Sequence, residues 1–187
     1  MNSIKAILLS TAVTLLFISC NKDEDTTPVD NESLIGSWSL ISLEADIDLE
    51  TNFSGLPIES STKSVGENFD YTLTFTETTY AVEGGYDLVT TGTVNGVPID
   101  SDTQSISGIS ETGTYEFSNS SITIDGQLYE FELNEIDTSG ISLDQSMDVA
   151  FNGDGNLVIT QNQEATITED GIDFTYNVDA VMILTKI

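Results

Sequence analysis

One stretch near the carboxyl end decides the fold: Ile172-Asp-Phe-Thr-Tyr-Asn-Val-Asp-Ala-Val-Met-Ile-Leu-Thr185. Its apolar residues recur at every second position from Ile172 to Leu184, and up to Asp179 the residues between them are polar. This period of two predicts one long β-strand with a buried face and a wet face. At roughly 3.3 Å per residue the strand would exceed about 40 Å, which suits a tilted barrel strand better than a small sandwich.

Turn signals divide the rest of the chain into hairpins. Asp125-Gly126 and Asn95-Gly96 each separate two alternating segments, and both dipeptides favour the type I′ turn. Three further turns are expected at Gly84-Gly85, at Asn152 to Gly155 and at Glu169 to Gly171. Consecutive hairpins of this kind predict an antiparallel up-and-down meander.

We expect roughly eight to ten strands and no helix after the N-terminal segment. The strands are placed near residues 35–44, 70–82, 86–94, 97–107, 111–117, 121–125, 127–136, 145–151, 156–168 and 172–185. Residues 45–69 contain Gly55, Pro57 and Gly66 and are interpreted as a long loop. A meander of this size closes most simply into an all-β barrel, because closure removes the exposed edges.

The amino terminus carries a targeting signal. Lys5 precedes the apolar run from Ala6 to Ile18, and the small residue Ser19 stands before Cys20, the chain's single cysteine. A basic start, a short apolar run and a small residue are typical of a secretory signal peptide, here residues 1–19. A transmembrane helix needs roughly 20 apolar residues, so the run is too short for one. A buried core helix and an unmodified thiol are the remaining alternatives.

The residues before Cys20, Leu16-Phe-Ile-Ser19, resemble a bacterial lipoprotein signal, with Phe17 where the usual motif has leucine. The resemblance implies cleavage before Cys20 and a thioether-linked diacylglycerol with acyl chains such as palmitate. Lys22-Asp23-Glu24 resembles a signal for the outer face of the Gram-negative outer membrane. Residues 20–33 are charged and contain Pro28, so we expect a flexible acidic tether. This expectation is the same for the inner and the outer leaflet of the outer membrane, and the sequence leaves the choice between them open.

Composition excludes several classes of function. The 187 residues carry a formal net charge of −28, with 32 Asp and Glu against 4 Lys and no His or Arg. Such a charge repels nucleic acid and anionic membrane surfaces, so membrane attachment would have to come from the lipid. Without His there is no Ser-His-Asp triad and no imidazole ligand, and we expect no enzyme activity, metal site or cofactor. Solubility is the simplest reading of the charge.

The first expected strand begins Leu34-Ile-Gly36-Ser-Trp38. Gly-x-Trp at this place, together with the meander, resembles the bacterial lipocalin-like lipoproteins of the calycin barrel family, over residues 33–187. The resemblance implies a lipocalin-like barrel domain at residues 34–187, with Gly36 turning closely across the floor and Trp38 closing that end. Lipocalins usually place a late arginine over the tryptophan, and here Lys186 is the only late cation that could do so.

The inward-facing aromatic residues are the candidate ligand-binding set. They are Trp38, Tyr71, Phe75, Phe131, Phe174 and Tyr176, accompanied by Leu73, Tyr129, Phe151, Leu157 and Ile159. Such an interior either packs solid or leaves a dry cavity for an apolar ligand, and the sequence leaves both outcomes open.

Two other motifs have simple readings. Asn152 to Asn156 alternates acids and amides like a calcium loop, but an EF-hand would need Gly and Glu where Leu157 and Gln163 stand. A glycine-rich hairpin turn is the favoured reading. Glu130 and Glu132 form a carboxylate pair of the kind used in glycoside hydrolysis, but on one strand face such a pair more often serves solubility.

The sequence thus predicts an outer-membrane lipoprotein, anchored through Cys20 and exposed at the cell surface, whose barrel binds a small hydrophobic ligand. The alternative is a non-catalytic structural or protein-interaction module with a filled barrel. A carboxylate-dependent hydrolase is a distant third reading. A cavity lined by the aromatic set would favour the first reading, and a filled barrel with an exposed apolar patch would favour the second. The ligand's identity, the role of residues 45–69 and the oligomeric state stay open.

Overall fold

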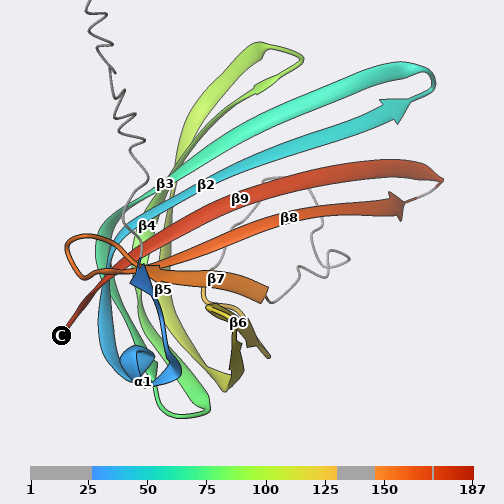
Figure 1. The fold of residues 1–187 in the computed structure, drawn as a ribbon. Coiled ribbons are helices and arrows are strands. Elements are labelled where there is room, and N and C mark those ends of the chain that lie inside the picture. The colour runs from blue at the N-terminus through green and yellow to red at the C-terminus, as the bar shows by residue number, and fades with distance from the viewer. Residues whose placement is uncertain (1–26, 130–145, 170) are drawn as a thin grey trace, which may run out of the picture.

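The protein is almost entirely β-structure in its computed structural model, which describes residues 27–129, 146–169 and 171–187. One short helix, α1 (Asn31–Leu34), accompanies the strands (Figure 1). The strands are β1 (Thr27–Pro28), β2 (Gly36–Phe53), β3 (Leu56–Phe75), β4 (Thr79–Val94), β5 (Val97–Ser118), β6 (Ser121–Ile124), β7 (Ser146–Phe151), β8 (Leu157–Glu169) and β9 (Ile172–Lys186). No helix among these residues is long and apolar enough to cross a membrane.

The strands form a single antiparallel ring. Each strand from β2 to β9 pairs with the next strand along the chain, and β9 pairs back with β2. The two-residue β1 adds to one side of β7. The predicted all-β, antiparallel up-and-down barrel is therefore confirmed. The register also explains the choice of fold, because closure gives β2 and β9 a partner along both edges.

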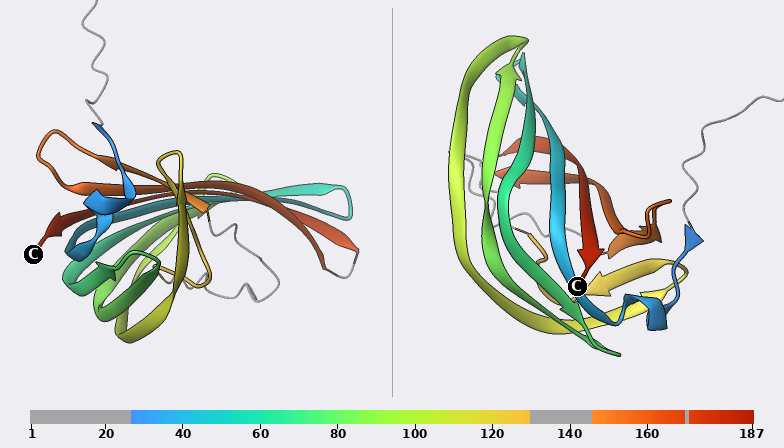
Figure 2. Two further views of the ribbon diagram at one scale, coloured as in Figure 1. Left: turned by 60° about the horizontal axis from the view of Figure 1, so that its bottom comes forward. Right: turned by 90° about the vertical axis from the view of Figure 1, so that its left-hand side faces the viewer.

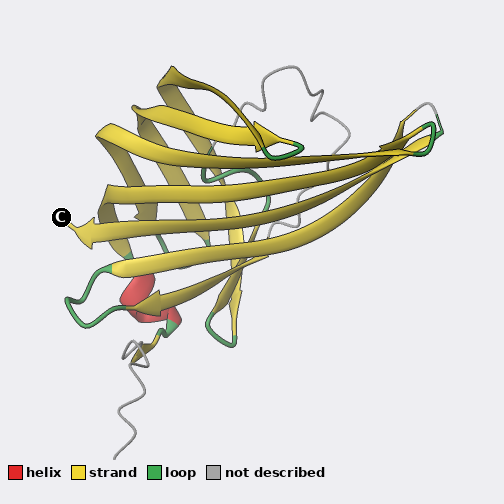
Figure 3. Ribbon diagram, turned by 90° about the horizontal axis from the view of Figure 1, so that it is seen from above, coloured by secondary structure: helices red, strands yellow, loops and turns green. Residues whose placement is uncertain are grey.

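Among the residues that the structure describes, the ring is closed at one end only. Two short strands, β6 and β7, complete the ring. β6 pairs with Tyr115–Ser118 of β5, and β7 pairs with Leu157–Thr160 of β8. Beyond these pairings, six long strands continue in the order β5-β4-β3-β2-β9-β8 as a curved open sheet (Figures 1 and 2). Seen from above, α1 and the carboxyl end lie together, opposite the tips of the β2–β3 and β8–β9 hairpins (Figure 3). We call these two regions the closed end and the open half.

The hydrophobic core fills the closed end. Its largest fully buried side chains are Trp38, Tyr71, Tyr80, Phe75, Leu34, Leu40, Leu43, Leu73, Leu88, Ile122, Leu157 and Ile159. Burying each of the larger apolar side chains contributes about 1.5–3 kcal/mol to stability. The apolar alternation of β9 continues into this core through Ala180, Met182 and Leu184, as its sequence pattern predicts.

Residues 27–34, which precede the first long strand, pack against the closed end. Thr27 and Pro28 pair with β7, and Val29 is buried in the core. Asp30 caps α1, since its Oδ1 accepts a hydrogen bond from Ser33 N at 2.8 Å. The expectation of a flexible tether reaching Ser33 is therefore wrong from Thr27 onward, because apolar burial and strand pairing hold that segment. Residues 1–26, with Cys20, lie outside the described part of the chain.

Residues 45–69 form strands, and the expectation of a long loop is wrong. They belong to β2 and β3, which pair from Glu44↔Val65 to Phe53↔Leu56. The apolar alternation that would reveal a strand is missing here because the inward positions of β3 are small hydroxyl residues, such as Thr62 and Ser64. Pairing with β4 and β9 on either side holds the segment extended. The hairpin turn is Ser54-Gly55, with φ of +54° and +86°.

Gly84-Gly85 lies inside β4, so the turn expected there is wrong. The extra residue of the irregular pairing is Gly108 of β5, since Gly84 pairs with Ile109 and Gly85 pairs with Ser107. A Cβ on Gly84 would lie 1.7 Å from the carbonyl oxygen of Asp70, and its φ is +118°. The pair therefore allows close approach of β3 and a strong local bend. The chain instead turns at Thr76–Thr79, where Thr76 Oγ1 accepts a hydrogen bond from Thr79 N at 3.0 Å. Likewise, residues 97–107 and 111–117 are parts of one strand, β5.

The other predicted turns are confirmed where the structure describes them. Asn95 and Gly96 have φ of +49° and +75°, as a type I′ turn requires. The Asn152–Gly155 turn joins β7 to β8, and Gly171 stands between β8 and β9. Asp125-Gly126 follows β6, but residues 127–129 are not in a strand, and the rest of the expected strand at 127–136 lies outside the described residues.

Candidate functional site

Trp38 plugs the closed end, as its motif predicts. Its side chain is 1% exposed, and its Nε1 donates a hydrogen bond to the carbonyl oxygen of Leu34 at 2.8 Å. Phe151 stacks on the ring with centroids 5.8 Å apart. Lys186 Nζ lies 5.0 Å from the ring centroid, which confirms the predicted cation–π contact. Gly36 makes room for this lysine, because a Cβ there would lie 3.1 Å from Lys186 Cε.

Tyr71 and Phe75 are equally enclosed. Tyr71 donates a hydrogen bond from its hydroxyl to the carbonyl oxygen of Leu128 and meets Tyr86 edge-on at 6.0 Å between centroids. Phe75 packs edge-on against Tyr115 at 5.1 Å. Burial raises the pKa of the Tyr71 hydroxyl well above its usual value, since the phenolate would lose its hydration.

The closed end is therefore packed solid around half of the predicted ligand-binding set. Trp38, Tyr71 and Phe75 are each 2% exposed or less, so almost none of their surface borders a space large enough for water. A small ligand would have to displace this packing, which has the density of a protein core. The sequence left open whether the barrel interior packs solid or holds a cavity, and at this end the interior is filled.

The interior of the open half has different chemistry. Its inward positions on β3 and β4 include Ser60, Thr62, Ser64 and Thr90, and Ser64 Oγ lies 3.0 Å from Thr90 Oγ1. On β3 and β4, hydroxyl groups replace the aromatic lining at this level.

A second apolar group lies on β2 and β9 in the same half, separate from the main core cluster. Ile47 pairs with Val178, Leu49 pairs with Tyr176, and both Tyr176 and Val178 are buried. Phe174 is half-buried, two residues further along β9. Two members of the predicted ligand-binding set, Phe174 and Tyr176, therefore lie here, about 35–40 Å along the strands from Trp38 at roughly 3.3 Å per residue. The sixth member, Phe131, lies outside the described residues, as do Glu130 and Glu132.

The sequence reasoning missed the apolar residues at the hairpin tips of the open half. They are Phe53 and Leu56 on the β2–β3 hairpin and Val94, Val97 and Ile99 on the β4–β5 hairpin, with exposed fractions between 38% and 68%. Large apolar side chains this exposed are unusual beside polar turns. The sequence feature that indicates this surface is a pair of apolar residues flanking each turn dipeptide, Ser54-Gly55 and Asn95-Gly96. The expectation of a loop at residues 45–69 hides it for Phe53 and Leu56.

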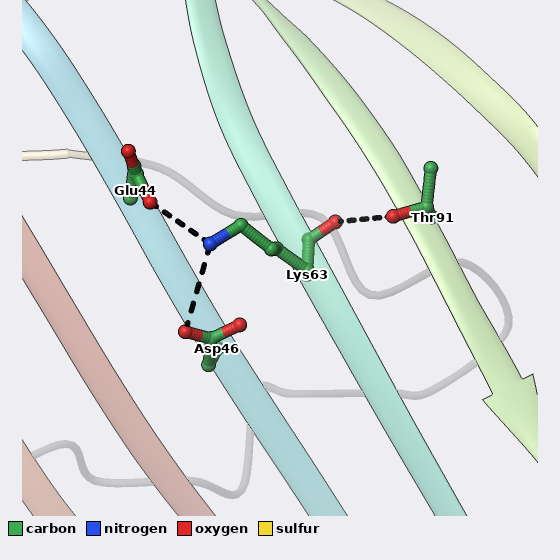
Figure 4. A network of polar contacts seen from close by, with 4 residues as sticks. All are labelled: Glu44, Asp46, Lys63 and Thr91. Carbon is green, nitrogen blue, oxygen red and sulfur yellow. Dashed lines mark hydrogen bonds and ion pairs between the residues drawn. The ribbon is translucent and has the colours of Figure 1, made fainter.

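The outer face of the open half is acidic. Glu44 and Asp46 on β2 share Lys63 of β3, whose Nζ lies 2.9 Å from Glu44 Oε2 and 4.0 Å from Asp46 Oδ2 (Figure 4). The hydrogen bond that Lys63 donates to Glu44 and the negative charge of Asp46 raise the pKa of Lys63. Further along, Glu50 and Glu59 face each other across the strands.

The other carboxylate groups that the structure describes are spread along the strands. An open depression beside the Glu50–Glu59 pair also includes Asp173. In the described ranges no group of three or more acids, cysteines or histidines is arranged to hold a metal ion. At Asn152, the side-chain Oδ1 accepts hydrogen bonds from Asp154 N and Asn156 N, both at 3.0 Å. This loop is the glycine-rich hairpin turn that its sequence favours.

No family model, curated protein or solved structure matches this chain. The features of the molecule that bear on function are its solid closed end, its open half and its apolar hairpin tips.

Proposed function

We propose that this protein is a bacterial lipoprotein, anchored at Cys20, whose barrel is a non-catalytic module that contacts another macromolecule. The observation that carries the proposal is the solid packing around Trp38, Tyr71 and Phe75, together with exposed apolar side chains at the hairpin tips. An interior filled in this way leaves the surface as the place of contact. Exposed apolar residues that gather at one place commonly mark an interaction site.

The position of the first described residues supports the anchor. Thr27 pairs with β7 at the closed end, and it lies seven positions after Cys20 in the sequence. A chain of that length spans at most about 25 Å. An acylated Cys20 would therefore hold the closed end near the bilayer, while β2, with 18 residues, runs about 55–60 Å toward the open half. The hairpin tips would then face away from the anchoring membrane, which suits display at the cell surface.

The chemistry of the buried polar groups supports a non-catalytic role. Ser64 and Gln161, which are buried and polar, are neutral. Burial raises the pKa of Tyr71 and Tyr129, which keeps both hydroxyls protonated at neutral pH. A tyrosine held protonated and hydrogen-bonded stabilises the fold but is a poor nucleophile.

The anchor is tested by Cys20→Ala in the full-length protein expressed in a Gram-negative host. We expect the variant to leave the membrane fraction and to lack the mass of the acyl chains, because the thiol is the attachment atom. Ser19→Ala is the matched control, since alanine keeps a small residue before the cleavage point. Membrane attachment and mass that are the same in Cys20→Ala and wild type would rule out the anchor.

A small apolar ligand is the second candidate function, and one observation favours it. Ile47, Tyr176 and Val178 are buried outside the main core cluster, with Phe174 half-buried beside them, so the open half has an apolar zone of its own. Native mass spectrometry of the full-length protein from its host would show a bound small molecule in a one-to-one ratio. We expect Phe174→Ala to reduce that signal and Phe117→Ala, at the closed end, to leave it. A bare protein mass in every preparation would exclude this function.

A further inference from the structure

The two neighbouring hairpins of the open half share one apolar surface. We call it the hairpin-end surface and define it by Phe53, Leu56, Ile58, Val94, Val97 and Ile99. The hairpins are tied to each other, because Asn95 N donates to the Glu59 carbonyl oxygen at 2.7 Å and Glu59 N donates to Asn95 Oδ1 at 2.9 Å. These bonds hold the two tips in a fixed relation, so the surface is a preformed one.

The strand register places these side chains on one face. Phe53 pairs with Leu56, and Val94 pairs with both Ser60 and Val97. Residues that oppose each other across a ladder point to the same side of the sheet. A Cβ on Gly92 would lie 3.3 Å from both Ile99 Cδ1 and Thr62 Oγ1, so these side chains also share that side. This side is continuous with the barrel interior, and Ile58 bridges the two tips along β3.

Acidic residues of β5 border this apolar surface. Asp102 pairs with Thr90, whose side chain faces the barrel interior, Asp100 is next to Ile99, and both acids are exposed. Glu50 and Glu59 lie on the opposite face of the same sheet, and the whole chain carries a net charge of −28. An apolar centre with a charged rim is the usual anatomy of a protein interface. The negative sign of the rim sets the sign of its partner, because like charges across an interface cost several kcal/mol.

We propose that the hairpin-end surface docks a protein segment whose apolar side chains are flanked by lysine or arginine. This inference rests on the proposed function, since it names the partner of the interaction module. A second copy of the chain would bring its own charge of −28 against the acidic rim. Anionic lipid would be repelled in the same way. A basic, apolar segment satisfies both the centre and the rim.

The test uses full-length lipidated protein in nanodiscs of neutral phosphatidylcholine and two synthetic peptides, one alternating lysine and leucine and one alternating lysine and serine. We expect the lysine–leucine peptide to bind at least tenfold tighter by surface plasmon resonance. The double variant Phe53→Ser/Leu56→Ser should abolish that advantage. The matched control Ile41→Ser/Val181→Ser removes apolar side chains that are also exposed but lie elsewhere, and it should keep the advantage. Circular dichroism checks that each variant is folded.

Four results would overturn the inference. Equal binding of the two peptides would mean that charge alone attracts them. An equal loss of the lysine–leucine advantage in both double variants would mean that the peptide does not bind specifically at the hairpin-end surface. Binding of the protein to empty neutral vesicles through Phe53 and Leu56 would assign the surface to lipid. Self-association that Phe53→Ser/Leu56→Ser abolishes in sedimentation would assign it to a second copy.

A photo-crosslinker separates failure of this inference from failure of the proposed function. It is placed at Leu56 or at Ile41 in the host cell, and the adducts are identified by mass spectrometry. Adducts to a basic protein from Leu56 alone support the inference. Adducts from Ile41 alone overturn the docking surface but leave the interaction module standing. A one-to-one small molecule with no adduct from either position overturns both.

Discussion

Single glycines decide where the strands bend and where they turn. Gly84 sits inside β4 with a φ of +118°, and a Cβ there would lie 1.7 Å from the Asp70 carbonyl oxygen and 3.0 Å from Tyr71 Cα. Both neighbours are backbone atoms of the paired strand β3, so they cannot move aside without breaking the ladder. Gly153 in the β7–β8 turn meets nothing within 4 Å at its Cβ position. Two glycines of the same chain thus carry very different structural demands.

At the residue scale we predict that Gly84→Ala destabilises the protein by about 3 kcal/mol or more, from the steric clash and the positive φ together. Gly153→Ala should change stability by no more than about 0.5 kcal/mol, as surface substitutions usually do. Urea unfolding followed by tryptophan fluorescence of Trp38 measures both. Equal midpoints for the two variants would show that β4 accommodates a side chain at Gly84 after all.

Strand pairs on the outer face of the open half carry like charges. Glu50 on β2 opposes Glu59 on β3, and Asp46 opposes Asp179 on β9. Like charges directly opposite one another on a sheet are destabilising. Lys63 offsets part of this repulsion for Glu44 and Asp46, but it lies four residues along β3 from Glu59. The stability of the open half is thus limited by its own charge.

At the element scale we predict that Glu59→Lys stabilises the protein by about 0.5–1 kcal/mol, because it turns a repulsive cross-strand pair into an attractive one. Glu164→Lys is the matched control, since it changes the net charge equally but faces the neutral Asn177. Thermal unfolding at low and at 1 M salt distinguishes the local effect from the global one. The difference between the variants should shrink at high salt, because salt screens exposed charges. If Glu164→Lys raises the melting temperature as much as Glu59→Lys, only net charge matters.

The molecule as a whole couples folding to the protonation of its buried tyrosines. Burial raises the pKa of Tyr71 and Tyr129 above the ordinary value near 10, and Tyr80 and Tyr115 shift in the same direction. A group with a raised pKa in the folded state contributes fully below its unfolded pKa. That contribution is lost as the pH rises above about 10, because the unfolded chain then releases protons that the folded chain keeps. The described tyrosines therefore predict alkaline unfolding.

At the scale of the whole molecule we predict that the free energy of unfolding falls steeply between about pH 10 and pH 12, by about 1.4 kcal/mol per pH unit for each retained proton. Tyr71→Phe should make this fall shallower by about one proton. At pH 7 it should lower stability by about 1 kcal/mol, because the hydrogen bond to the Leu128 carbonyl oxygen is lost. Urea unfolding at a series of pH values measures the slope. A slope unchanged by Tyr71→Phe would place the alkaline titration elsewhere.

The sequence by itself determined the parts of this protein that depend on neighbours along the chain. The alternation in β9, the Asn95-Gly96 turn and the up-and-down order follow from backbone geometry and burial within a few residues. The contact of Lys186 with Trp38 joins residues distant in sequence, and it was predicted only through the family resemblance of the Gly36-Ser-Trp38 motif.

Only the tertiary structure decided the rest. Residues 45–69 are strands because β4 and β9 pair with them, although their hydroxyl-rich inner face lacks the alternation of a buried strand. Gly84 must be glycine because the Asp70 backbone lies beside it, and Thr27 to Leu34 pack because the closed end offers β7 and a core. The exposed hairpin-end surface likewise depends on which face the register turns inward. In each case the deciding contact joins residues distant in sequence, and no local pattern records it.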